Sequence, residues 1–295
     1  MGRAGLDISA RVEEQVRALV EHEAVARLGD DPEGVHQMRV AVRRLRAALK
    51  ATPDTGLDPV RDELRWLGGV LGRVRDLDVL LGRIRTQSAD FPPAERAAVE
   101  RLLAGLVADR RRARRRLLEV FDGSRYTALL HTLTGLRVPA PRDGDALLEV
   151  IAGPHRKLRR DALALGDDPP DDDLHALRIR GKRLRYAAEL AEPTGGKPVR
   201  RLIKATREFQ DVLGDHQDAC VAEAEIRDQL ADLTELADID HEAVFVAGRL
   251  VEREHAVRAD RRARWHEAFT EVDRLAADLL SAAARPPTPP ARRRP

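Results

Sequence analysis

Apolar residues recur every three or four positions along most of the chain, which is the spacing of amphipathic helices. The pattern predicts helices over residues 8–28, 33–51, 58–87, 93–121, 125–136, 144–165, 171–192, 197–231 and 238–284. Pro169-Pro170, Pro193 and Gly195-Gly196 break the pattern in the second half, and the last range is long enough to include a helix-ending bend. We therefore expect an all-α protein.

The two halves of the chain resemble each other in sequence. Val35–Arg46 matches Leu174–Arg185 without a gap, 139 residues later. A second match follows in the same order, 142 residues apart: Leu71-Gly72 with Asp76, and Leu213-Gly214 with Asp218. Ordered matches at nearly constant separation indicate a duplicated unit of about 140 residues. We expect one domain over residues 1–284, made of two repeats at about 8–136 and 144–284, each a helical bundle.

The ends of the chain and its single cysteine bear on its location. Residues 285–295 are rich in proline and arginine, which predicts a disordered tail. Cys220 alone cannot form an internal disulfide or a cysteine zinc cluster, and it fits a reducing compartment. The chain has no apolar stretch of the roughly 20 residues that span a bilayer, and its start lacks a signal sequence. We expect a cytoplasmic protein without a membrane partner.

Charged residues are abundant but nearly balanced. They make up 35% of the chain, yet the formal net charge is only +2, so positive and negative charge must be segregated locally. Only five of the 52 basic residues are lysine. A planar guanidinium suits bidentate contact with phosphate oxygens, although a GC-rich coding sequence also favours arginine. The position of the cations therefore matters more than their number.

The helix predicted over residues 33–51 carries two neighbouring stripes. The apolar stripe, expected to be buried, comprises Val35, Met38, Val42, Leu45 and Leu49. The first basic stripe, roughly 100° around the helix, comprises His36, Arg39, Arg43, Arg46 and Lys50. Cations at one-turn spacing repel one another, so this stripe should attract an anion. The alternative is a solvated face whose arginine stems cover the edge of the core.

The same two stripes recur in the second repeat. The apolar stripe there comprises Leu174, Leu177, Gly181, Leu184 and Ala188. The second basic stripe comprises His175, Arg178, Lys182 and Arg185, and Glu189 replaces the lysine of the first copy. Two basic stripes on repeated helices would line one continuous groove if they face each other, and such a groove suits a long anion.

These residues resemble the signature of a known family. His-x-x-Arg-x-x-x-Arg-Arg-Leu-Arg at 36–46 and His-x-x-Arg-x-x-x-Lys-Arg-Leu-Arg-Tyr at 175–186 are similar to the paired motif of the conserved histidine α-helical domain, CHAD. The Leu-Gly-x-x-x-Asp segments at 71–76 and 213–218 resemble its second motif. The resemblance covers nearly the whole chain. It implies two antiparallel four-helix bundles, related by pseudo-two-fold symmetry, with a central basic groove that binds inorganic polyphosphate.

The resemblance also implies which residues contact phosphate. They are His36, Arg39, Arg43, Arg44, Arg46, His175, Arg178, Lys182, Arg183 and Arg185, to which we add Lys50 as part of the first basic stripe. Arg44 and Arg183 fall almost opposite the stripes on a helical wheel, so they either contact ligand or pair with carboxylates of a neighbouring helix. Lys204 and Arg207, like Arg65 and Arg73, lie on the following helices and extend the predicted groove.

Histidines and carboxylates raise the alternatives of metal binding and catalysis. Neither His36 nor His175 has a second ligand at metal-binding spacing on its own helix face. A histidine beside arginines should have a lowered pKa and donate a hydrogen bond as a neutral ring. Asp76 and Asp218 are expected to orient arginines by ion pairing rather than to hold a catalytic metal. We therefore expect no metal, no cofactor and no enzymatic activity, although a phosphate-processing enzyme is the less favoured alternative.

Nucleic acid is the strongest rival ligand, because a basic groove attracts any phosphate backbone. Single-strand binders stack bases on aromatic side chains, and aromatic residues make up only 3% of this chain. Proteins that recognise the sequence of duplex DNA expose polar side chains that contact the base edges, whereas the cations of this chain flank buried stripes. We therefore expect inorganic polyphosphate as the partner, with other polyanions or nucleic acid as the alternative. Decoration of polyphosphate granules, regulation of an enzyme and storage are the roles compatible with that partner, in any oligomeric state.

Overall fold

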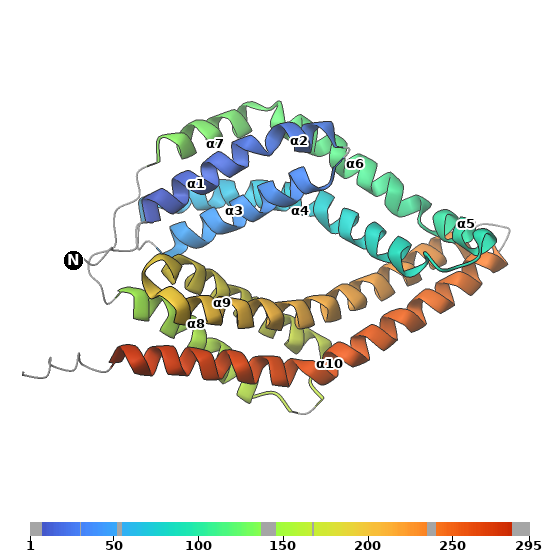
Figure 1. The fold of residues 1–295 in the computed structure, drawn as a ribbon. Coiled ribbons are helices and arrows are strands. Elements are labelled where there is room, and N and C mark those ends of the chain that lie inside the picture. The colour runs from blue at the N-terminus through green and yellow to red at the C-terminus, as the bar shows by residue number, and fades with distance from the viewer. Residues whose placement is uncertain are drawn as a thin grey trace, which may run out of the picture. The chain divides into compact units, whose positions relative to one another are not determined.

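A computed structural model of the chain describes residues 8–29, 31–51, 55–136, 146–166, 168–234 and 240–284. Within these ranges the protein is built from helices and contains no strand (Figure 1). None of these helices is long and apolar enough to cross a membrane. The predicted all-α class is therefore confirmed for the part of the chain that the structure describes. The predicted disordered tail at 285–295 lies outside the described residues.

Helix bounds agree closely with those predicted from apolar spacing. The helices are α1 (Ile8–Glu21), α2 (Glu23–Leu28), α3 (Glu33–Ala51), η1 (Thr55–Leu57), α4 (Asp58–Gln87), α5 (Pro93–Leu102), α6 (Ala104–Phe121), α7 (Ser124–Thr134), α8 (Ala146–Leu163), α9 (Asp171–Thr234) and α10 (His241–Ala284). Two predicted helices are each divided. His22 (φ −89°, ψ −5°) separates α1 from α2, and Leu103 (φ −83°, ψ −1°) separates α5 from α6. Both residues lie near the bridge region of the Ramachandran map, away from ideal α-helical dihedrals.

The two long C-terminal helices differ from each other in continuity. In α9, Gly196 adopts φ 58° and ψ −144°, a conformation available to glycine at low cost, and so divides the helix into two segments. The predicted break at Gly195-Gly196 is confirmed. By contrast, α10 runs as one helix from His241 to Ala284. The helix-ending bend that we allowed for in this range does not interrupt the helix.

The chain divides into two compact units, and each unit is made of segments that are not contiguous in the sequence. Among the described residues, the larger unit contains everything up to residue 136 together with residues 212–234 and 240–263. The smaller unit contains residues 146–166, 168–211 and 264–284. Residues of the second predicted repeat therefore belong to both units. The α3 helix lies in the larger unit, and residues 171–211 of α9 lie in the smaller one, so the predicted groove between their basic stripes stays a prediction.

In the larger unit, α3 packs against α1, α2 and α4 (Figure 1). Every residue of its predicted apolar stripe is at most 2% exposed: Val35, Met38, Val42, Leu45 and Leu49. Residues three and four positions apart share one face of a helix, which explains why this pattern identifies the buried side. The prediction of a core face is confirmed for α3.

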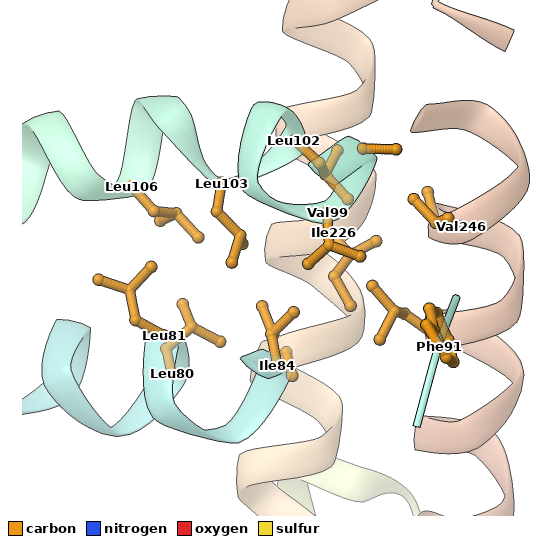
Figure 2. Packing of buried hydrophobic residues seen from close by; sticks show 14 of the residues in the cluster. Leu80, Leu81, Ile84, Phe91, Val99, Leu102, Leu103, Leu106, Ile226 and Val246 are labelled. Atoms are coloured by element: carbon orange, nitrogen blue, oxygen red, sulfur yellow. The ribbon is translucent and has the colours of Figure 1, made fainter. Parts of the chain in front are cut away.

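A second part of the larger unit joins segments far apart in the sequence. Figure 2 shows Leu80, Leu81 and Ile84 of α4 meeting side chains of α5, the start of α6, α9 and α10. Ile226 of α9 and Val246 of α10 complete this cluster, and both are at most 1% exposed. Burial of this apolar surface is the main force that holds residues 212–234 and 240–263 to the N-terminal helices.

An ion pair is buried in the same unit. Arg83 on α4 donates hydrogen bonds from Nε to both carboxylate oxygens of Glu254 on α10, at 2.8 and 3.0 Å, and from Nη2 to Oε2 at 2.5 Å. The Glu254 side chain is 0% exposed. Burial lowers the pKa of Arg83, but Glu254 and the charges of Asp218 and Asp215 outweigh it and raise the pKa. Such a bidentate pair fixes the register of α10 against α4.

In the smaller unit, α8, both segments of α9 and the C-terminal part of α10 pack together. The predicted apolar stripe of α9 is buried, since Leu174, Leu177, Leu184 and Ala188 are at most 1% exposed. A Cβ atom on Gly181 would lie 2.7 Å from the ring of Phe209, so only glycine permits this contact. Phe209 lies 6.4 Å, centroid to centroid, from Phe269 of α10. His155 Nε2 of α8 lies 2.7 Å from a carboxylate oxygen of Asp273 of α10.

Candidate functional site

The first basic stripe follows the edge of the α3 core face. His36, Arg39 and Arg43 are half-buried, whereas Arg46 and Lys50 towards the C-terminal end are exposed. Side chains next to a buried stripe lie partly against the neighbouring helix, which restricts them more than fully exposed side chains. The structure thus brings His36, Arg39 and Arg43 together at the boundary of the core. Arg44, whose role we left open, is exposed.

Three residues of α4, spaced four positions apart, lie against the side chains of this stripe. A Cβ atom on Gly68 would lie 3.9 Å from Nη1 of Arg46. A Cβ atom on Gly72 would lie only 2.2 Å from Nη1 of Arg39. One turn further, Asp76 Oδ1 lies 3.3 Å from Nη2 of Arg39. In the first repeat the Leu-Gly-x-x-x-Asp motif therefore positions Arg39. Gly72 leaves space for the guanidinium, and Asp76 forms an ion pair with it.

His36 lies among positive charges. Its partial burial lowers the pKa of the imidazole, and the nearby charge of Arg75 lowers it further, followed by those of Arg43 and Arg39. Glu33 acts in the opposite direction but does not reverse the shift. The lowered pKa predicted for a histidine beside arginines is therefore confirmed for His36. A neutral imidazole here donates one hydrogen bond and becomes a cation when an anion binds.

Arg75 of α4 is a candidate site residue that our sequence analysis missed. It is half-buried, and it forms no ion pair or hydrogen bond with any residue that the structure describes. Its position three residues after Gly72 is the signal that could have identified it, because residues three apart share a helix face. The two arginines that we did name on α4 have carboxylate partners: Arg65 lies 2.6 Å from Asp62, and Arg73 lies 3.5 Å from Asp109.

The second basic stripe lies on the first segment of α9. His175, Arg178 and Lys182 are half-buried, and Arg183 is exposed. The Nε atom of Arg178 is buried and has no hydrogen-bond partner among the described residues. A buried guanidinium nitrogen without an acceptor is costly, and a ligand oxygen would satisfy it. Arg183, for which we considered a carboxylate partner, forms no ion pair with any described residue.

One carboxylate distinguishes the second stripe from the first. Glu189, at the position of Lys50, has Oε1 at 3.7 Å from Nε of Arg185 and at 3.6 Å from Nη2 of Arg207. The side chains of Glu189 and Arg185 are only 14% and 18% exposed, so water screens this pair weakly, whereas Arg207 is 55% exposed and its pair is screened more. Lys204 is exposed and lies 3.6 Å from Glu208. Glu189 therefore reduces the positive potential of the second stripe near Arg185 and Arg207.

Two aromatic side chains, one on α9 and one on α4, are already in contact with arginines. The Arg185 guanidinium lies 5.1 Å from the ring centroid of Tyr186. Arg125 lies 3.9 Å from the ring centroid of Trp66 on α4. Cation–π contacts of this kind cover the ring faces on which a nucleobase would stack. These two rings are therefore poorly suited to reading a base.

Comparison with known proteins shows to which family the chain is similar. A family model described as CHAD domain matches residues 10–227 of the chain. Two curated relatives, uncharacterized protein MT2285 and uncharacterized protein Rv2226 from two strains of Mycobacterium tuberculosis, are each 34% identical over 259 residues, which is 82% of this chain and 48% of theirs. The chain thus spans about half the length of these relatives.

Solved structures show the same fold. PptA from Streptomyces chartreusis superposes with a TM-score of 0.69 at 20% identity, over 90% of this chain and 99% of that one. The crystal structure of the CHAD domain from the plant Ricinus communis superposes with a TM-score of 0.64 at 27% identity, over 89% of both chains. The first similarity concerns the fold alone, and the second agrees with the family match.

Proposed function

The chain belongs to the CHAD domain family, and on that basis we propose that it binds inorganic polyphosphate through the basic stripes of α3 and α9. The observation that carries the proposal is the group of positive charges around His36, where Arg39, Arg43 and Arg75 all lower the imidazole pKa. Like charges held together in a folded protein repel one another, and a bound polyanion relieves that repulsion. Arginine is also suited to phosphate, because its planar guanidinium binds two oxygens at once.

The two-repeat architecture is part of the same proposal. Two four-helix bundles related by pseudo-two-fold symmetry would each contribute one basic stripe, and both stripes would bind the same anion. The corresponding half-buried arginines, Arg39 and Arg178, support this reading. Arg39 is held by Asp76, and the buried Nε of Arg178 has no hydrogen-bond partner among the described residues.

We propose a binding role rather than a catalytic one. Asp76, a carboxylate beside the first stripe, already pairs with Arg39 at 3.3 Å. An Asp that neutralises an arginine is a weaker ligand for the magnesium ions that phosphoryl transfer requires. A cytoplasmic protein that decorates polyphosphate granules, regulates an enzyme or stores ligand fits this role.

Competition binding tests the proposal. Long-chain polyphosphate is titrated into the purified protein at physiological salt, with single-stranded or duplex DNA at equal phosphate concentration as competitor. We expect polyphosphate to be preferred, and the Arg39→Ala/Arg178→Ala variant to lose most of the binding. Arg96→Ala/Arg156→Ala removes the same charge from exposed positions outside both stripes and is the matched control. Equal competition by DNA, or full binding by the first variant, would refute polyphosphate binding by the stripes.

Binding should strengthen as the pH falls. In the free protein the His36 pKa is lowered, so the ring is neutral near neutral pH. A bound polyanion raises that pKa. At a pH between the pKa of the free protein and that of the complex, binding is therefore accompanied by uptake of a proton. Between about pH 8 and about pH 6 we therefore expect a several-fold gain in affinity, bounded by tenfold per unit for one proton.

The pH effect is measured by calorimetry in buffers of different ionisation enthalpy, which reports the protons taken up on binding. In His36→Gln the uptake should fall, and the affinity should change less with pH. His131→Gln, at an exposed position on α7, is the control and should behave like the unaltered protein. An unchanged proton uptake in His36→Gln would show that another group titrates.

A further inference from the structure

A second concentration of positive charge lies on α6, on residues that belong to neither basic stripe. Six of the seven residues from 110 to 116 are arginine. Two of them face inward: Arg110 pairs with Asp78 of α4, and Arg114 donates hydrogen bonds to the backbone carbonyls of Ala26 and Arg27 at 3.2 and 2.7 Å. These two arginines therefore have structural partners.

The other four arginines form the outer face of α6, which comprises Arg111, Arg112, Arg115 and Arg116, all of them exposed. Arg112 pairs with Asp109, and Arg116 pairs with Glu119 at 3.0 Å. Arg111 and Arg115 form no ion pair or hydrogen bond with any residue that the structure describes. The outer face therefore combines four guanidinium groups with two carboxylates and is net positive.

Helix geometry directs this face away from the rest of the larger unit. Leu106, Leu117 and Val120 are the buried residues on one side of α6. At 100° per residue, Arg111 and Arg115 fall on the opposite side of the helix. Both α3 and α6 pack on α4 (Figure 1). Arg111 and Arg115 therefore point away from α4, whereas Arg39 points towards it.

The arrangement is unfavourable without a ligand. Arg111 and Arg115 are one turn apart, as are Arg112 and Arg116, and like charges at this spacing destabilise a helix. Ordinary solvated helix faces relieve such repulsion with carboxylates of neighbouring turns. Here the carboxylates reach only Arg112 and Arg116. An anion with closely spaced charges would lie along all four guanidinium groups, which span about 7.5 Å at 1.5 Å per residue.

We propose that the outer face of α6 is a second polyphosphate-binding site, separate from the basic stripes; this inference rests on the proposed function. Guanidinium groups bind phosphate oxygens in bidentate pairs, and the outer face contains no aromatic side chain on which a base would stack. A polyanion without bases therefore fits it better than single-stranded nucleic acid. With one site on the stripes and one on α6, a single molecule links two polyphosphate segments.

Binding stoichiometry and light scattering test the inference on the full chain. Polyphosphate of one defined medium length is titrated by calorimetry, and long-chain polyphosphate is added in a scattering assay. We expect two classes of site and strong scattering for the unaltered protein. Arg111→Ser/Arg115→Ser should keep the tighter class, lose the weaker one and scatter at least fivefold less. Arg111→Lys/Arg115→Lys keeps the charge without the planar group and should be intermediate, and all variants should retain the helical circular dichroism signal.

The outcomes separate this inference from the proposed function. If the serine variant binds and scatters like the unaltered protein while Arg39→Ala/Arg178→Ala loses binding, the α6 site is refuted and the stripes stand. If the unaltered protein binds no polyphosphate, the proposed function fails and this inference fails with it. If the serine variant loses self-association in the absence of polyphosphate, the outer face contacts a second copy of the chain, which also overturns the proposal.

Discussion

Replacing Glu254 with alanine should destabilise the larger unit by about 3–5 kcal/mol, because the substitution leaves the Arg83 guanidinium without its buried partner. Arg83 makes three hydrogen bonds to this carboxylate, and its own side chain is only 17% exposed, so water cannot replace the lost bonds. A loss of this size is a large part of the stability of a typical domain. Urea unfolding followed by circular dichroism measures it.

Two further variants separate the buried charge from other effects. Glu252→Ala removes the same charge two residues away, where the side chain is 83% exposed, and should change stability by less than about 0.5 kcal/mol. Arg83→Met/Glu254→Leu removes both charges and should recover stability to within about 2 kcal/mol of the unaltered protein, because apolar pairs often replace buried ion pairs. If Glu254→Ala unfolds at the same urea concentration as Glu252→Ala, the pair has no net structural role.

Much of the helical framework was predictable from apolar spacing alone. The five-residue apolar stripe of α3 and the matching stripe of α9 are both buried. Helix periodicity fixes which residues share a face, and burial of that face is the dominant stabilising term, so the pattern is visible in the sequence. The division at His22 was missed because no proline or glycine lies beside it, and the one at Leu103 because a single glycine, Gly105, is tolerated within a helical pattern.

Contacts between distant segments were not predictable in the same way. The Arg83–Glu254 pair joins residues 171 positions apart, and no local spacing rule connects them. The same reason explains why the sequence did not indicate that residues 212–234 and 240–263 pack with the end of α4. A helical wheel orders the residues of one helix, whereas the choice of partner helix depends on how complete surfaces fit together.

The candidate site was predictable in part, and the two stripes differ more than their sequences indicate. The wheel placed His36, Arg39 and Arg43 beside the core, where they lie. It could not show that Glu189 is shared by Arg185 and Arg207. Under the proposed function, the first stripe should therefore contribute more to affinity than the second, because a phosphate must compete with Glu189 for the arginines of α9.

Gly72→Ala should weaken polyphosphate binding about tenfold without lowering stability. The added methyl carbon would lie 2.2 Å from Nη1 of Arg39 and 3.5 Å from its Cζ, so the guanidinium must move away from α4. The Arg39 side chain is 31% exposed and can do this without unfolding the helix. Moving it breaks the ion pair with Asp76 and removes one pre-positioned phosphate contact, and a charge-assisted hydrogen bond of about 1.5 kcal/mol corresponds to roughly tenfold in affinity.

Stability should respond in the opposite direction, because alanine inside a helix is favoured over glycine by about 0.5–1 kcal/mol. Gly69→Ala is the matched control: it lies on the same helix, and its Cβ atom would meet nothing within 4 Å. Both variants should unfold at the same or a higher urea concentration than the unaltered protein, and only Gly72→Ala should bind polyphosphate less tightly. Equal affinities for the two variants would mean that the position of Arg39 does not control binding. A loss confined to Gly72→Ala would instead identify Gly72 as a residue kept small so that Arg39 can reach the ligand.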